Sequence, residues 1–281
     1  MPTNREVYFQ LLKENNKYLS KSVIVSLLAD ANGFDDRMAL YKDFDKEVKN
    51  IDAIFANAER VKKGEPYQYV LGYSYFLGQK ILLNENVLIP RQETEQLTVD
   101  TLVYLKDRLL DSDAVVVDVC TGSGAIASVI EKEMPRASIF ATDISEKALE
   151  VAGKNVTRTQ LLLGNLIDPL IEKNIKVDVL ICNPPYIENQ ERIDEQVWKH
   201  EPHLALLATP GTKCYEEIFS KHKEIMKEHF LMAFEIEDDM EGKLTYLINK
   251  YFDDCSYRFS KDIYNKMRFL YIIKWRRYEY A

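Results

Sequence analysis

The segment after Asp113 alternates short apolar runs with helical runs, and this alternation restricts the possible folds of the chain more than any other feature. The apolar runs are AVVVDVC, ASIFATDI, QLLLGNL and VDVLICNPPY, and the helical stretches AIASVIEKEM and SEKALEVAGKNV lie between the first three. Nearly continuous apolar strands separated by helices are typical of a parallel sheet that is covered on both faces. HFLMAFEIE predicts a later strand, and SYRFS and MRFLYIIKW predict a final antiparallel pair. The sequence therefore predicts an α/β fold.

The part of the chain before this alternation is predicted to be helical. Up to Gly64, apolar residues recur every three or four positions, with breaks at Ser20 and Gly33. Residues 66–90 change to aromatic and β-branched residues punctuated by glycine and asparagine, which predicts a β-hairpin or two short strands. A further helix, TEQLTVDTLVYLKDRLL, is predicted to begin near Thr94. We therefore predict a helical domain over residues 1–64, a hairpin linker over 65–90 and an α/β domain over 91–281.

The charge of the chain bears on the kind of partner that it binds. Its 37 Lys and Arg against 45 Asp and Glu give a net charge of −8 and an isoelectric point near 5.2. The deficit is uneven, because residues 1–84 have 12 basic and 11 acidic side chains, whereas residues 85–281 have 25 and 34. Proteins that bind nucleic acid gain much of their affinity from Lys and Arg that neutralise phosphates. The balance therefore argues against a direct nucleic-acid partner.

The cysteines and the lack of long apolar runs indicate the compartment. Cys120, Cys182, Cys214 and Cys255 are 62, 32 and 41 positions apart, which matches no metal-ligand spacing. The chain has no run of roughly 18 apolar residues and no N-terminal basic segment followed by an apolar one. We expect reduced thiols, no metal, no membrane association and a cytoplasmic location.

The first chemical motif is VVVDVCTGSGAIA, in which an apolar strand leads directly into a helix. Gly122 and Gly124 allow backbone to approach a ligand at the carboxyl edge of a parallel strand, where α/β sheets bind ligands. The alternative is a tight strand-to-helix turn without a ligand. The loop lacks the third glycine of GxGxxG, which weakens a dinucleotide interpretation and favours a nucleoside without a pyrophosphate, such as S-adenosyl-L-methionine (AdoMet).

Asp143 follows the next predicted strand, in IFATDIS, 19 residues beyond Gly124. An acidic residue about 20 positions after the glycine loop suits the hydroxyl groups of a ribose. Helix N-capping by Asp143 or Ser145 is the alternative, and one side chain could serve both purposes.

The third motif is Asn183-Pro184-Pro185-Tyr186, at the end of the strand VDVLIC. Two successive prolines fix φ and remove two backbone donors, so the local carbonyls are available as acceptors. An amide NH2 is a poor nucleophile, because its lone pair is delocalised. Hydrogen bonds from its two N–H groups to the Asn183 side-chain oxygen and the Pro184 carbonyl would orient the nitrogen for attack on a sulfonium methyl group. The Tyr186 ring would pack on a planar substrate group, or it is a core aromatic.

Together these motifs resemble the NPPY-type AdoMet-dependent methyltransferases, and more closely the release-factor glutamine methyltransferase (PrmC/HemK) family. The specific match is EPYQYVLGYSYFLGQKILLNENVLIPRQETEQL, which resembles the family's linker and its PRxETE segment. The resemblance implies a helical substrate-docking domain, a hairpin linker and a Rossmann-like, seven-stranded class I methyltransferase domain. It also implies transfer of methyl from AdoMet, leaving S-adenosyl-L-homocysteine, to the side-chain nitrogen (N5) of the glutamine in the GGQ motif. The protein substrates would be class-1 peptide chain release factors, which act in translation termination.

The resemblance also assigns roles to individual residues. The residues assigned to the cofactor are Glu93, Thr94, Cys120, Thr121, Gly122, Ser123, Gly124, Asp143, Asn165, Leu166 and Asn183. The residues assigned to the substrate are Arg91, Asn183, Pro184, Pro185 and Tyr186, of which Asn183, Pro184 and Tyr186 are assigned to catalysis. Asp143 would contact the ribose, and Asn165 with Leu166 the adenine end. Helix capping is the alternative role of Glu93 and Thr94.

Three assigned residues depart from the family pattern. Cys120 stands where many members have glycine, and Leu166 stands where some have an aromatic residue. Asn165 stands where aspartate is common, and its side-chain oxygen can accept a hydrogen bond from an adenine amino group as a carboxylate does.

Three other functions are compatible with the same motifs. A ribosomal-protein glutamine N5-methyltransferase would need an almost identical site. An adenine-N6 nucleic-acid methyltransferase uses the NPPY chemistry on another amine, but the acidic charge and the lack of a long insertion for target recognition argue against it. A binding module without activity would not need all of TGSG, Asp143 and NPPY.

Overall fold

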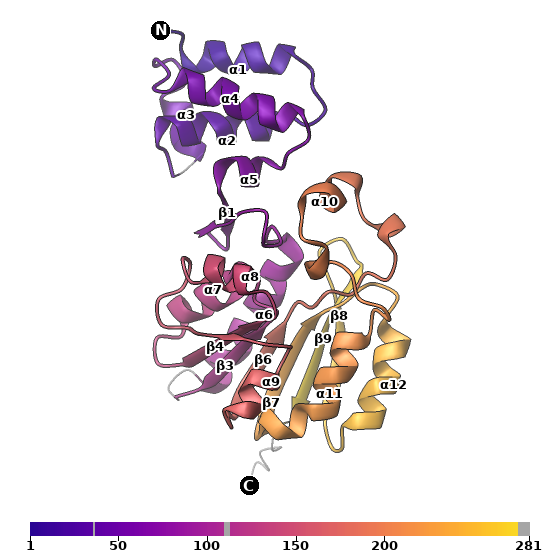
Figure 1. Cartoon of the computed structure of the whole chain (residues 1–281). Helices are drawn as coiled ribbons and strands as arrows, with labels where there is room; N and C mark the ends of the chain where they lie inside the picture. Colours follow the sequence, from indigo (N-terminus) through magenta and orange to yellow (C-terminus); the bar gives the residue numbers. More distant parts are fainter. Residues whose placement is uncertain (36, 110–112, 275–281) are drawn as a thin grey trace. The chain divides into compact units, whose positions relative to one another are not determined.

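A computed structural model describes residues 1–35, 37–109 and 113–274, which form two compact units (Figure 1). The first unit comprises Met1–Tyr73 and Glu195–His200, and the second comprises residues 74–194 and 201–274. The division falls within the predicted linker, and no pattern in the sequence predicted that residues 195–200 group with the N-terminal residues. Leu110 and Trp275, the last residues of two predicted elements, lie outside the described residues.

The first unit is helical. Its helices are α1 (Asn4–Lys13), α2 (Lys21–Asn32), α3 (Arg37–Lys42), α4 (Ile51–Lys62), α5 (Tyr67–Leu71) and α10 (Glu195–His200). The predicted breaks coincide with helix ends, since the Ser20 hydroxyl caps α2 and Gly33 ends it at φ +74°. The helix α10 is connected to this unit by a 2.9 Å hydrogen bond from Gln196 Nε2 to the Tyr18 hydroxyl. Gly64 has φ +96°, and a Cβ there would collide with the Gln196 side chain.

The predicted hairpin is present, as the two-stranded sheet of β1 (Tyr73–Phe76) and β2 (Gln79–Leu82). The preceding helix α5 was not predicted. Its five residues are too few to show helical periodicity, and Gly72 ends it at φ +77°.

The second unit is built on a seven-stranded sheet in the order β5-β4-β3-β6-β7-β9-β8. The strands are β3 (Val115–Val119), β4 (Ser138–Asp143), β5 (Gln160–Leu163), β6 (Val177–Cys182), β7 (Met226–Glu235), β8 (Ser256–Lys261) and β9 (Met267–Lys274). The first five strands in this order are parallel, and β9 is antiparallel to both β7 and β8. The predicted α/β fold, including its final antiparallel pair, is confirmed.

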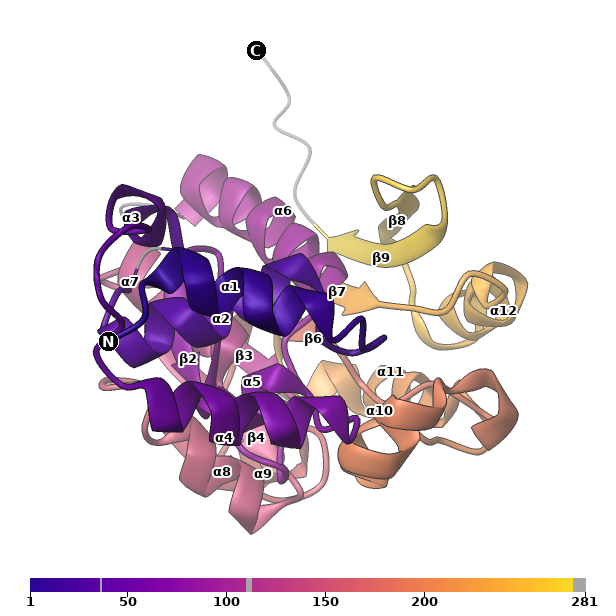
Figure 2. The same ribbon diagram turned by 90° about the horizontal axis from the view of Figure 1, so that it is seen from above.

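Helices cover both faces of this sheet, as the strand pattern predicts. The helices are α6 (Gln92–Leu109), α7 (Ala125–Glu133), α8 (Glu146–Ala152), α9 (Asp168–Glu172), α11 (Lys213–Ile225) and α12 (Glu241–Tyr251), with short 3-10 turns at Gln190–Arg192 and His203–Ala205. Neighbouring residues of β3 face opposite cores: Val116 packs with α6 and α7, and Val117 packs with α9, α11 and α12. Figure 2 shows α6 and α11 on opposite sides of the sheet.

The strand order reverses between β3 and β6. From β3 the chain proceeds through β4 to β5 on one side, and then returns to place β6 and β7 on the other. The loops that follow β3 and β6 therefore diverge at the carboxyl edge, and α/β sheets bind their ligands in the crevice at such a point.

Candidate active site

The sheet register brings three residues at the strand ends into one row at this edge. Val119 of β3 pairs with Cys182 of β6, and Cys182 pairs with Phe234 of β7. The next residues along these strands are Cys120, Asn183 and Glu235. The TGSG loop, the NPPY motif and the end of β7 therefore meet at a single place.

A cavity of about 340 Å³ lies at this place. Eleven of the predicted site residues line it: Arg91, Thr94, Cys120, Thr121, Gly122, Ser123, Asp143, Asn165, Leu166, Asn183 and Pro185. The described lining does not include Glu93, Gly124, Pro184 or Tyr186. Part of the remaining wall, from residues 202–209, was not predicted, because nothing in its local sequence indicates a ligand.

The two glycines of the TGSG loop serve different purposes. Gly122 lines the cavity at φ +54°, and a Cβ there would meet no atom within 4 Å, so this backbone faces open space. Gly124 begins α7 at φ +78°, and a Cβ there would lie 3.1 Å from the Ala152 Cβ of α8. Gly124 is therefore required for helix packing, as in a tight strand-to-helix turn, whereas Gly122 leaves room for a ligand. Cys120 has φ +59°, a conformation that glycine would adopt at lower cost.

Asp143 ends β4 beside this loop, and its carboxylate organises the local backbone. One oxygen accepts from the Gly122 amide at 2.9 Å, and the other accepts from the Ser145 amide at 2.9 Å. Ser145 is the N-cap of α8, so capping and cavity lining occur together here. Burial raises the pKa of Asp143, and backbone donors oppose that effect. A carboxylate has about four lone-pair sites, so two hydroxyl groups of a ribose could still bind it.

Asp118, within β3, supports the loop from beneath and was not predicted as a site residue. It is fully buried, and one oxygen accepts from the Thr121 hydroxyl at 2.5 Å and from the Ala127 amide at 3.2 Å. Its other oxygen has no hydrogen-bond partner among the described residues. Burial raises the pKa of Asp118 to about 7.

This buried carboxyl predicts a pH-dependent stability. Because its pKa rises from 3.8 to about 7 on folding, its contribution to stability is present below pH 4 and is lost as the pH rises through 7. Relative to Asp118→Asn, the wild type should lose about 3 kcal/mol of unfolding free energy between about pH 5 and pH 8. Urea unfolding of both proteins across this range measures the difference. A difference that does not vary with pH would contradict the assignment.

Asn165 and Leu166 lie on the side of the cavity next to α11. Asn165 Nδ2 donates to Glu217 Oε1, a contact that the sequence did not predict. This contact directs the Asn165 amide, so its carbonyl oxygen is the atom that remains to accept from a ligand. Leu166 has φ +46° and packs into the core, where it is 6% exposed.

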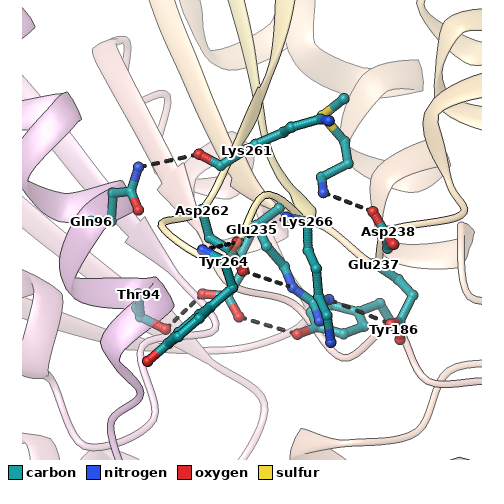
Figure 3. Close-up of polar contacts among 12 residues, drawn as sticks. Thr94, Gln96, Tyr186, Glu235, Glu237, Asp238, Lys261, Asp262, Tyr264 and Lys266 are labelled. Atoms are coloured by element: carbon teal, nitrogen blue, oxygen red, sulfur yellow. Dashed lines mark hydrogen bonds and ion pairs between the residues drawn. The ribbon is translucent and has the colours of Figure 1, made fainter.

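A hydrogen-bonded network at the end of β7 fixes the NPPY motif, and Figure 3 shows three of its members, Thr94, Tyr186 and Glu235. Asn183 Nδ2 donates to Thr94 Oγ1 at 3.0 Å, and Thr94 Oγ1 donates to Glu235 Oε2 at 2.6 Å. The Tyr186 hydroxyl donates to Glu235 Oε1 at 3.1 Å, and the ring packs against the core. Tyr186 is thus partly buried against the core and does not line the cavity. Glu235 was missed, although it is the first carboxylate of HFLMAFEIE.

The segment before Thr94 contributes a second wall. Arg91 forms an ion pair with Glu201 at 2.5 Å, and Glu201 also accepts from the Ile89 amide at 3.0 Å. Glu201 is 4% exposed, so the pair is largely buried. It connects the residue before α6 to the segment that follows α10. Thr94 is the third residue of α6 and directs its hydroxyl to Glu235, so it does not cap the helix.

The described residues contain no group of three or more His, Cys, Asp or Glu side chains placed to bind a metal ion. The four cysteines, all within the described ranges, are free. In residues 1–35, 37–109 and 113–274, no helix is long and apolar enough to cross a membrane.

Comparison with known proteins identifies relatives over most of the chain. Residues 98–203 match the Methyltransferase small domain family. Release factor glutamine methyltransferase from Staphylococcus aureus is 36% identical over 212 residues, which cover 73% of this chain and 74% of that protein. The Mycoplasma mycoides protein of the same name is 32% identical over 278 residues, covering 93% and 95%. The crystal structure of the hMettl16 catalytic domain with MAT2A 3'UTR hairpin 6 has a TM-score of 0.52 and 14% identity, covering 81% of this chain and 83% of that one. This last likeness shows a shared fold alone.

Proposed function

Because the chain belongs to the release factor glutamine methyltransferase family, we propose that it methylates the side-chain amide nitrogen (N5) of the GGQ glutamine in class-1 peptide chain release factors. The proposed methyl donor is AdoMet, with S-adenosyl-L-homocysteine as the product. The observation that supports this best is the row formed by the TGSG loop, Asn183 and Glu235 at the strand-order reversal. In that row, the TGSG loop, which would bind a nucleoside, lies next to the Asn183 side chain, which would accept hydrogen bonds from a substrate amide.

The residues present fit AdoMet. Gly122 leaves open space where a side chain would otherwise lie, and Asp143 presents a carboxylate to the same cavity. The Asn165 side-chain oxygen would accept from the adenine amino group, because its nitrogen is already bound to Glu217. When bound, AdoMet supplies a methyl group on a positively charged sulfur, which is a strong electrophile.

The chain's own residues would prepare the glutamine amide. The Asn183 side-chain oxygen and the Pro184 carbonyl would each accept one N–H of the substrate amide. These two acceptors would orient the nitrogen lone pair and increase its electron density. Once methylated, the cationic nitrogen is acidic, so water can accept the proton and no protein base is required.

We also propose that the first unit, with α10, docks the protein substrate. Its near-neutral charge does not suit a nucleic acid, and the acidic charge lies in residues 85–281. An adenine-N6 nucleic-acid methyltransferase and a ribosomal-protein glutamine methyltransferase are the other functions to be tested.

Mass spectrometry of methyl acceptors tests this proposal. The full chain is incubated with AdoMet carrying a deuterated methyl group and, in separate reactions, with a class-1 release factor, ribosomal proteins, RNA or duplex DNA. We expect one labelled methyl group on the GGQ glutamine, and none on a release factor with that glutamine replaced by glutamate. Label on nucleic acid or on a ribosomal protein alone would overturn the proposal.

A further inference from the structure

Glu235 is a buried carboxyl group that no assigned role accounts for. It is the last residue of β7 and is 3% exposed. A buried carboxyl is unfavourable unless its oxygens receive hydrogen bonds, and both of its side-chain oxygens do, from Thr94 and Tyr186. Its backbone carbonyl accepts from the Tyr215 hydroxyl at 2.6 Å. The end of β7 is therefore fixed from three elements.

The direction of these hydrogen bonds determines how the Asn183 amide is oriented. A threonine hydroxyl has one hydrogen, and Thr94 gives it to Glu235 at 2.6 Å. Thr94 can then only accept from Asn183, so the Nδ2 side of the amide must face it, at 3.0 Å. The Asn183 oxygen consequently points away from Thr94.

We propose that Glu235 is a positioning residue for methyl transfer, which acts through Thr94 to direct the Asn183 side-chain oxygen toward the substrate nitrogen. The inference rests on the proposed function, because only an N–H donor on the substrate requires an acceptor at this position. Asn183 lines the cavity whereas Glu235 does not, so Glu235 acts without touching the ligands.

A glutamine at position 235 would have one acceptor oxygen for the two hydroxyl donors that Glu235 serves, Thr94 and Tyr186. When the new NH2 group of Glu235→Gln faces Thr94, it donates to the Thr94 hydroxyl. The hydrogen of that hydroxyl can then be donated to the Asn183 oxygen. The Asn183 amide would turn by half a rotation and present its NH2 to the substrate NH2, so that two donors would face each other. In Thr94→Val the amide has no partner to select one orientation.

The chain offers a matched control for the threonine. Thr101 is on the same helix, is fully buried and donates its hydroxyl to the Leu97 carbonyl at 2.8 Å. Thr101→Val therefore removes an equivalent buried hydroxyl that has no connection to Asn183. Glu237→Gln is the control for the carboxylate. Glu237 lies two residues after Glu235 and forms ion pairs with Arg192 and Arg268.

Steady-state methyl transfer to the release factor, together with calorimetric binding of AdoMet, tests the proposal. We expect Thr94→Val and Glu235→Gln to lower kcat on the order of 10- to 100-fold, as for other groups that orient a catalytic ligand by hydrogen bonding. KM and the AdoMet Kd should change by less than about threefold, because the relay acts on the orientation of Asn183 rather than on binding. Thr94→Ser retains the hydroxyl and should restore most of kcat.

The double variant provides a second measurement. Because both residues act through one chain of hydrogen bonds, combining Thr94→Val with Glu235→Gln should lower kcat no further than the more damaging single change. A kcat for Thr94→Val equal to that of Thr101→Val, with wild-type transfer intact, would overturn the positioning role. So would a full multiplicative loss in the double variant. Absence of wild-type transfer to the release factor would instead overturn the proposed function, so the two failures are distinguishable.

Discussion

Replacing Asn183 with alanine is expected to lower kcat by about 10²- to 10³-fold, because it removes an acceptor for the substrate amide. The Asn183 side chain lines the cavity, and its Nδ2 donates a hydrogen bond to Thr94. The side-chain oxygen is therefore the atom available to the substrate. The interaction matters most when the nitrogen becomes electron-rich and pyramidal, which assigns the loss to kcat rather than to KM. AdoMet binding should change by less than about threefold. Single-turnover methyl transfer and calorimetry measure the two quantities separately.

Asn165→Ala is the matched control, because it removes the same type of side chain from the other end of the cavity. Asn165 is directed by Glu217 toward the proposed adenine site, so this variant should weaken AdoMet binding and leave single-turnover transfer at saturating AdoMet near the wild-type rate. If Asn183→Ala transferred methyl at the wild-type rate, the mechanism proposed for NPPY would be wrong. If both variants affected binding alone, the amide acceptor would have to lie elsewhere.

The sheet could be predicted because its signal is local. A buried parallel strand must be apolar along nearly its whole length, so β3, β4 and β6 were visible in the sequence as short runs, and the edge strand β5 is also an apolar run. The chemistry at the strand ends was equally visible, because Gly122, Asp143 and NPPY follow those runs directly. Parallel strands end at one edge of the sheet, so the parallel arrangement alone predicts that the three motifs lie close together.

The residues that were missed act across the fold rather than along the chain. Glu235 is 52 positions after Asn183, and only the register of β6 with β7 shows that they are in one row. Glu217 reaches Asn165 from α11 through a contact between distant segments. The short helix α10 packs with the N-terminal residues of the first unit, where the Gln196 side chain lies against Gly64, 132 positions earlier in the chain. Such pairings depend on tertiary packing, which periodicity does not report.

Replacing Asp143 with asparagine is expected to weaken AdoMet binding on the order of 100-fold. Each Asp143 oxygen already accepts from a backbone amide, of Gly122 or of Ser145, and both oxygens remain open to a ribose. An asparagine NH2 would face one of these N–H groups as a second donor, which disturbs the TGSG loop as well as the proposed ribose contact. The loss of two hydrogen bonds to a charged group, each at the lower end of the usual range at about 1.5 kcal/mol, corresponds to this change in Kd. Calorimetric titration with AdoMet measures it.

The pH dependence of AdoMet binding distinguishes the effect of the Asp143 charge from the effect of its contacts with the local backbone. Burial raises the pKa of Asp143, so acidification should protonate it, and weaken AdoMet binding, at a higher pH than for an ordinary aspartate. Asp143→Asn should lose this acid limb. The control is Asp253→Asn, which alters an exposed aspartate that pairs with Lys223 and does not line the cavity, and this variant should bind AdoMet with the wild-type Kd and pH profile. Wild-type affinity in Asp143→Asn would show that the carboxylate does not contact the cofactor, and would leave Asp143 as a residue that organises the backbone between β4 and α8.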